Sequence, residues 1–214
     1  SYVLGVLSQE QLRHAAFPLG DDVKGDVRAE AERRGLLVAR KPDSHDICFI
    51  PDGDTAAFLR RRLGSQPGDI VDAQTGEVVA QHDGAFAFTI GQRRGLNLRT
   101  PAEDGAPRYV VDVDATARTV TVGPPAMLDV DLIEGIRPIW AGPAISGEAV
   151  AVHAQVRAHG VPVPATAHVA GDRLIVLLDE PIRGLATGQA VVLYDGTRVV
   201  GSATIDRTRR VVNA

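Results

Sequence analysis

From residue 65 onward the chain consists of short β-forming runs bounded by Gly, Pro and Asp, and this feature limits its fold most strongly. In residues 150–157 small and apolar side chains alternate with polar ones towards the end, and Tyr194-Asp195-Gly196-Thr197 supplies an Asp-Gly hairpin turn. The runs are residues 85–90, 108–113, 118–122, 149–157, 161–169, 173–178, 190–194 and 198–205. Their close spacing after Pro124-Pro125 predicts a small antiparallel barrel.

The first 64 residues carry helical signals instead. Ser8-Gln9-Glu10-Gln11 is a capping-box pattern that predicts a helix running on to Phe17, before Pro18. A second helix is predicted over residues 23–34, ended by Gly35. A third is predicted over residues 55–63, with Asp54 as its N-cap and Gly64 as its stop.

Composition excludes several classes of protein and favours a packed one. Hydrophobic residues make up 44% of the 214 and charged residues 23%, so we expect folded domains rather than disorder. One cysteine allows no internal disulfide and no CxxC zinc site, and indicates a reducing compartment, the cytoplasm. The six histidines have no metal-ligand spacing, so no metal site is expected. No apolar run is long enough to predict a membrane span, and the net charge of −4 is not the basic footprint typical of nucleic-acid binding.

The single cysteine, Cys48, lies in the apolar run Ile47-Cys48-Phe49-Ile50, with turn-forming residues on both sides. One interpretation is a buried, inert thiol that serves as a small hydrophobe. The other is a nucleophile on a positioned loop, which requires a thiolate. The neighbouring aspartates disfavour a thiolate, so activation would have to come from elsewhere in the fold or from sulfur already delivered to Cys48. Local sequence leaves both interpretations open.

Four polar residues are candidates for binding. Arg93 and Arg94 lie between two glycines in Gly91-Gln92-Arg93-Arg94-Gly95, where two guanidinium groups could reach phosphates or simply occupy a solvated turn. Arg157 and Gln189 lie in or beside predicted barrel strands, and each could equally be an ordinary exposed polar residue. No GxxxxGK[ST] or GxGxxG phosphate loop is present.

An ordered series of motifs along essentially the whole chain resembles the bacterial tRNA-specific 2-thiouridylases (tRNA-uridine 2-sulfurtransferases). The series begins with Leu7-Ser8-Gln9-Glu10-Gln11-Leu12 and the cysteine motif Asp43-Ser44-His45-Asp46-Ile47-Cys48-Phe49-Ile50. It continues with Thr89-Ile90-Gly91-Gln92-Arg93-Arg94-Gly95-Leu96, Asp179-Glu180-Pro181 and Thr187-Gly188-Gln189.

The resemblance implies an α+β architecture in three parts. Residues 1–54 would be the helical C-terminal end of an α/β nucleotide-binding (ATP-pyrophosphatase) domain and would carry the cysteine loop. Residues 55–126 would form a small β-rich central domain, and residues 127–214 a C-terminal antiparallel β-barrel that binds tRNA. The chain does not open on Met, and the family's ATP loop and partner cysteine have no counterpart in it. We therefore expect a fragment, the C-terminal two-thirds of such an enzyme, inactive by itself.

The resemblance also implies a reaction. Such enzymes use ATP with Mg to adenylate O2 of the wobble uridine (position 34) in tRNAs for Lys, Glu and Gln, and a cysteine persulfide then supplies sulfur to C2. Cys48 matches the cysteine expected to carry the persulfide, which a cysteine desulfurase or a sulfur-relay protein would load. Arg157 and Gln189 match tRNA-contacting residues, although Ala158 stands where the family often has Tyr. Arg93 and Arg94 are further tRNA-binding candidates.

Two rival hypotheses remain at the level of sequence. The first is a non-catalytic RNA- or protein-binding β-barrel module in which Cys48 is a core residue. The second is a thiol-dependent sulfur carrier that never touches RNA. The first predicts a thiol protected from alkylation, and the second predicts that residues 127–214 can be removed without loss of sulfur uptake.

Overall fold

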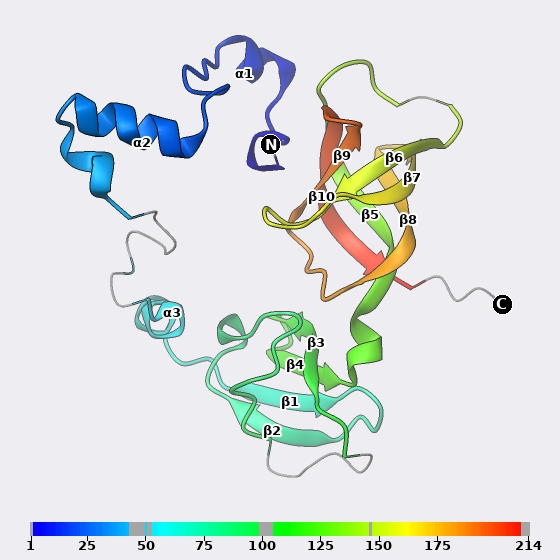
Figure 1. The fold of residues 1–214 in the computed structure, drawn as a ribbon. Helices are drawn as coiled ribbons and strands as arrows, with labels where there is room; N and C mark the ends of the chain where they lie inside the picture. The colour runs from blue at the N-terminus through cyan, green and yellow to red at the C-terminus, as the bar shows by residue number, and fades with distance from the viewer. Residues whose placement is uncertain (1, 43–49, 51–52, 99–104, 146, 211–214) are drawn as a thin grey trace.

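The computed structural model describes residues 2–42, 50, 53–98, 105–145 and 147–210, and Figure 1 shows their arrangement. Helical segments come first and two β units follow. The helical segments are η1 (Tyr2–Leu4), α1 (Gln9–Arg13), α2 (Lys24–Arg33), η2 (Leu37–Arg40) and α3 (Thr55–Leu63). Within the described residues, no helix combines the length and the apolar character needed to cross a membrane.

Side-chain caps fix where α1 and α3 begin. The Ser8 hydroxyl and the Gln11 side chain form both halves of the predicted capping box at the start of α1. The Asp54 carboxylate accepts a hydrogen bond from the backbone N–H of Ala57 at 2.8 Å, and α3 has the predicted limits. The prediction that the first helix reaches Phe17 is wrong, because α1 ends at Arg13. The residues that follow are exposed, and Pro18 disfavours a helical conformation of the residue before it.

The first β unit is a mixed four-stranded sheet of the strands β1 (Gly68–Asp72), β2 (Val78–His82), β3 (Tyr109–Asp114) and β4 (Thr119–Gly123). The strand order is β2-β1-β4-β3; β1 and β4 are parallel and the other pairs antiparallel. Ile70, Val110, Val120 and Val122 are fully buried and form its core.

One predicted strand in this unit is wrong. Residues 85–90 contain the short helix η3 (Ala85–Ala87) and no strand. The backbone N–H groups of Ala87 and Phe88 donate to the carbonyls of Gly84 and Ala85 within the segment itself. These local hydrogen bonds satisfy the backbone in a turn, so the β-forming side chains do not join the sheet.

The second β unit is a closed, antiparallel barrel of six strands in the order β10-β5-β8-β7-β6-β9. The strands are β5 (Asp129–Trp140), β6 (Val150–Gln155), β7 (Val163–Ala170), β8 (Arg173–Arg183), β9 (Ala190–Asp195) and β10 (Arg198–Arg209). The predicted Asp-Gly turn joins β9 to β10. Helix η4 (Pro125–Leu128) leads from the mixed sheet directly into β5 (Figure 1). The α+β architecture with a β-rich unit and a C-terminal barrel is therefore confirmed.

Candidate functional site

Cys48, the predicted sulfur-carrying residue, lies outside the described residues. The nearest described neighbour in the sequence is Ile50, whose side chain is buried. The role of the thiol therefore stays a prediction. The other four candidate residues are described, and they lie on three loops: Arg93 and Arg94 on one, Arg157 after β6 and Gln189 before β9.

The first loop contains Arg93 and Arg94 and is organised by Gln92. Gln92 Oε1 accepts a hydrogen bond from the backbone N–H of Thr89 at 3.1 Å, and Gln92 Nε2 donates one to the carbonyl of Arg94 at 2.9 Å. The backbone of Gly91 donates to the carbonyl of Val110 in β3 at 2.8 Å. Both arginine side chains are exposed in this loop, whose backbone the Gln92 side chain holds by its two hydrogen bonds. The sequence predicted a turn with two guanidinium groups but not the role of Gln92 within it.

The second region is the end of β6, where Arg157 begins a turn. Gln155 is buried, and its Nε2 donates to the carbonyls of Arg157 and Gly160, each at 2.9 Å. Its Oε1 accepts the hydroxyl of Tyr194 in β9 at 2.8 Å. Burial raises the pKa of Tyr194, and nearby Tyr2 adds to the effect, so this hydroxyl stays protonated and can donate at neutral pH.

The Arg157 side chain points along the barrel end to the segment after β8. Its Nη2 donates to the backbone carbonyl of Arg183 at 2.8 Å and to that of Gly184 at 2.6 Å. The Arg157 side chain as a whole is exposed. Arg183 is itself paired with Asp129, so its guanidinium is engaged with the barrel.

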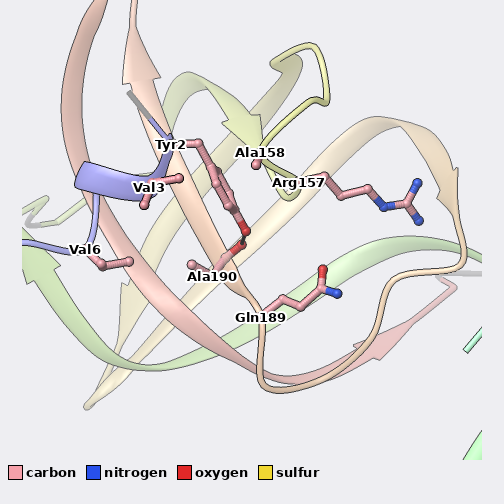
Figure 2. A pocket seen from close by; sticks show the side chains of 7 residues that line it. All are labelled: Tyr2, Val3, Val6, Arg157, Ala158, Gln189 and Ala190. Atoms are coloured by element: carbon pink, nitrogen blue, oxygen red, sulfur yellow. Dashed lines mark hydrogen bonds between the residues drawn. The ribbon is translucent and has the colours of Figure 1, made fainter. Parts of the chain in front are cut away.

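Gln189 lies just before β9, and β10 fixes its backbone. The carbonyl of Gln189 accepts the N–H of Ile205 at 2.8 Å, while the Gln189 side chain is exposed. Arg157 and Gln189 line one pocket of about 420 Å³, and in Figure 2 both side chains extend away from the Val3 and Val6 side of it.

The N-terminal segment supplies the other wall of this pocket. The Tyr2 hydroxyl donates to the carbonyl of Ala190 at 2.8 Å, and burial raises the pKa of Tyr2 despite that hydrogen bond. A methyl group built on Gly5 would lie 2.6 Å from Cγ1 of Val192, so this segment packs closely on β9. Nothing in the local sequence signals that Tyr2 would lie beside Arg157 and Gln189, which are far away in the chain.

The loop of Arg93 and Arg94 meets the segment between β8 and β9 at a pair of glycines. A Cβ built on Gly91 would lie 3.9 Å from the Cα of Gly184, and the reverse distance is 3.8 Å. The structure therefore brings the loop of Arg93 and Arg94 against the segment that Arg157 holds. The sequence did not single out Tyr2, Gln155 or Gly184 as residues of this arrangement, and it named Tyr194 only as part of a hairpin turn. Among the described residues, no group of His, Cys, Asp and Glu is arranged to hold a metal ion.

Comparison with known proteins assigns each part of the chain to a domain family. Residues 1–52 match the model of the tRNA methyl transferase HUP domain, and residues 56–124 match that of the tRNA methyl transferase PRC-barrel domain. Residues 130–205 match the aminomethyltransferase β-barrel domain.

Curated relatives match across the same span. The tRNA-specific 2-thiouridylase MnmA of Streptomyces avermitilis is 60% identical over 216 residues, which is 100% of this chain and 57% of the relative. The protein of the same name from Acidothermus cellulolyticus is 60% identical over 98% of this chain and 58% of its own length. That from an Arthrobacter species is 55% identical over 100% and 60%.

The chain thus spans somewhat more than half the length of the curated relatives that it matches. The identity is high and runs along the entire chain, and the three domain models follow one another without overlap. By this evidence the chain belongs to the family of the tRNA-specific 2-thiouridylases.

Proposed function

We propose that this chain is the tRNA-binding and sulfur-carrying portion of an enzyme that makes 2-thiouridine at the wobble position of tRNA. The observation that carries the proposal is the identity of 55–60% to proteins named tRNA-specific 2-thiouridylase along 96–100% of the chain. The barrel and the loop of Arg93 and Arg94 supply a surface with exposed cationic and amide groups, which suits contacts to a phosphate backbone.

Each of three parts of the chain has its own proposed role. Residues 1–54 would complete the catalytic domain and carry Cys48. Residues 55–126 would form the central domain, and residues 127–214 would form the barrel that binds the tRNA. Arg93, Arg94, Arg157 and Gln189 would bind the tRNA. The enzyme would act in the cytoplasm, where thiols stay reduced.

In the proposed chemistry, sulfur reaches the base from a persulfide on Cys48. Adenylation of the uridine O2 at the expense of ATP would turn that oxygen into a good leaving group, and AMP would depart as the outer persulfide sulfur bonds to C2. A second cysteine would then release the sulfur and form a disulfide with Cys48. Cys48 is the only cysteine of the 214 residues, so the second thiol would come from outside this chain.

The test compares the complete gene product that contains this chain with its Cys48→Ser variant. Each is incubated with ATP, a persulfide donor and unmodified tRNA, and 2-thiouridine per tRNA is counted by mass spectrometry. Thiolation by the wild type alone is the expected result. Thiolation by both would leave the enzyme but remove the role of Cys48, and thiolation by neither would favour a non-catalytic binding module.

A further inference from the structure

A second cavity lies in the mixed-sheet unit, apart from the pocket of Arg157 and Gln189. Its volume is about 390 Å³, within the range of about 300–1,000 Å³ that is typical of small-ligand sites. The last turn of α3, the end of β2, helix η3 and the loop of residues 92–97 surround it. The lining residues that matter most are Arg60, His82, Phe86, Phe88, Gln92 and Asn97.

Aromatic rings form the apolar part of the cavity wall. The rings of His82 and Phe88 have centroids 5.4 Å apart and an interplanar angle of 55°, so each limits the orientation of the other. A Cβ built on Gly84 would lie 2.3 Å from Cε1 of Phe86, so the Phe86 ring rests directly on the Gly84 backbone. Any larger residue at position 84 would displace that ring. The wall is thus built from rings in fixed positions, which suits a planar ligand.

His82 adds a polar atom that lacks a partner. The residue is only 7% exposed, and its Nε2 lies 3.2 Å from the carbonyl of Arg118, which requires a hydrogen on Nε2. Nδ1 of the neutral ring is then an acceptor, and it is buried with no hydrogen-bond partner among the described residues. Buried polar atoms in folded proteins nearly always have a partner, so this acceptor favours a bound molecule that carries an N–H group.

Cationic groups lie at the edge of the cavity. The residues on either side of the exposed Arg93-Arg94 pair both line it. Arg60 Nη2 lies 3.5 Å from the Asp83 carboxylate, which also borders the cavity, and both of these side chains are more than half exposed. An exposed ion pair of this kind is weak. A phosphate group beside a ligand in the cavity would therefore find guanidinium groups nearby.

We propose, on the basis of the proposed function, that this cavity binds one unstacked nucleobase of the tRNA. Proteins that read single-stranded RNA stack splayed-out bases on aromatic side chains and form hydrogen bonds to the base edges. Phe86 and Phe88 supply the rings, and His82 and Asn97 supply partners for the base edge. A free nucleotide has the same chemistry, but the adjoining arginine pair favours a base that lies in a chain of phosphates.

The test measures the affinity of the 214-residue chain for unmodified tRNA over a series of salt concentrations. Phe86→Leu keeps an apolar side chain but removes the ring. It is expected to weaken binding by about fivefold or more, the lower end of what stacking of one base contributes. Because no phosphate contact is lost, the slope of log K against log salt should stay unchanged, whereas Arg93→Ala should change that slope by about 0.7–0.9.

Two further variants calibrate this result. Asn97 has φ +48°, so Asn97→Gly removes the side-chain amide at a position whose backbone conformation suits glycine. It is expected to weaken binding by about two- to tenfold, the size of one hydrogen bond. Phe17→Leu is the matched control, because it makes the same exchange at an exposed phenylalanine outside the cavity and should leave the affinity unchanged. Wild-type affinity in both Phe86→Leu and Asn97→Gly, or an equal loss in Phe17→Leu, would overturn the proposal.

Crosslinking on the wild-type chain separates this proposal from the proposed function. Ultraviolet light joins nucleobases to aromatic side chains that they contact, and mass spectrometry of the complex with unmodified tRNA locates the joined peptides. Crosslinks within residues 82–88 are expected. Their absence from a chain that binds tRNA would overturn the cavity proposal and leave the proposed function in place.

Mononucleotides distinguish the two sources of a nucleobase. Binding of AMP, CMP, GMP and UMP to the same chain is measured by calorimetry and is expected to be far weaker than binding of tRNA. Mononucleotide binding that Phe86→Leu weakens, with tRNA affinity unaffected by that variant, would assign the cavity to a free nucleotide and overturn the assignment to tRNA. If the wild-type chain binds neither tRNA nor a mononucleotide, the cavity proposal and the proposed tRNA-binding role both fail.

Discussion

The helical segments and the two β units differ in how their apolar side chains are covered. Helices α1, α2 and α3 bury no residue at all, and Leu37 after α2 is 99% exposed. In the barrel, by contrast, Ile133, Leu174 and Val191 are fully buried. Each β unit therefore has its own core, whereas the helices have none among the described residues, and α1 and α3 begin at side-chain caps. We expect stability to reside in the β units.

The largest effect is expected at the buried ion pair of the mixed sheet. Arg108 Nε donates to Asp72 at 2.8 Å, and both side chains are buried. Arg108→Met would leave the Asp72 carboxylate buried without its cation, at a cost of about 3–5 kcal/mol. Circular dichroism during urea unfolding measures this loss. A variant as stable as the wild type would show that the pair contributes nothing to this core.

A core truncation in the barrel comes next. Leu174→Ala is expected to lower the free energy of unfolding by about 2–5 kcal/mol, because it removes a fully buried side chain and leaves a cavity. Trp140, the single tryptophan, lies in β5, so its fluorescence reports on the barrel. If the two β units unfold separately, Arg108→Met should leave this fluorescence transition in place.

The barrel is also expected to lose stability in acid. The hydrogen bond from Arg183 holds the pKa of Asp129 below its ordinary value. A carboxylate with a lowered pKa in the folded state stabilises that state above its unfolded pKa, about 3.9, and this contribution is lost as the pH falls through the folded value. The urea concentration at the midpoint of unfolding, followed by Trp140 fluorescence, should therefore decrease as the pH is lowered below about 4. Asp129→Asn should flatten that pH dependence, and an equally steep curve in this variant would contradict the assignment.

The smallest effect is expected in the helical region. Leu37→Ser replaces an almost fully exposed side chain and should change stability by less than about 0.5 kcal/mol. It is the matched partner of Leu174→Ala, since each changes one leucine. A loss as large as that of Leu174→Ala would mean that the helices share a core with the β units, and the comparison would fail.

The sequence predicted those elements that have strong local signals. Asp54 and Gly64 delimit α3 as expected, and Asp195-Gly196 forms the β9–β10 turn. Strand β5 was not predicted, because Gly135, Pro138 and charged residues interrupt its pattern and the register shifts at bulges. Strand β8 is longer than expected, since Asp179-Glu180-Pro181 hides its continuation.

The site was less predictable than the fold, because its residues meet through long-range contacts. Arg93 and Arg94 are exposed in a loop, as their glycine neighbours suggested. Gln155 occupies an alternating strand, where a polar residue predicts a solvent-facing position, yet it is buried and bonded to Tyr194. No local pattern encodes the contact of Gly91 with Gly184, because it depends on how one β unit lies against the other.

We have proposed that sulfur chemistry depends on Cys48 and that tRNA affinity depends on the β units. The most direct test measures both tRNA affinity and 2-thiouridine per tRNA in the complete gene product, for Cys48→Ser and for Arg93→Ala/Arg94→Ala. The account predicts that Cys48→Ser loses thiolation at unchanged affinity, and that the arginine variant binds more weakly but recovers thiolation at saturating tRNA. Retained thiolation in Cys48→Ser, or unchanged affinity in the arginine variant, would contradict it.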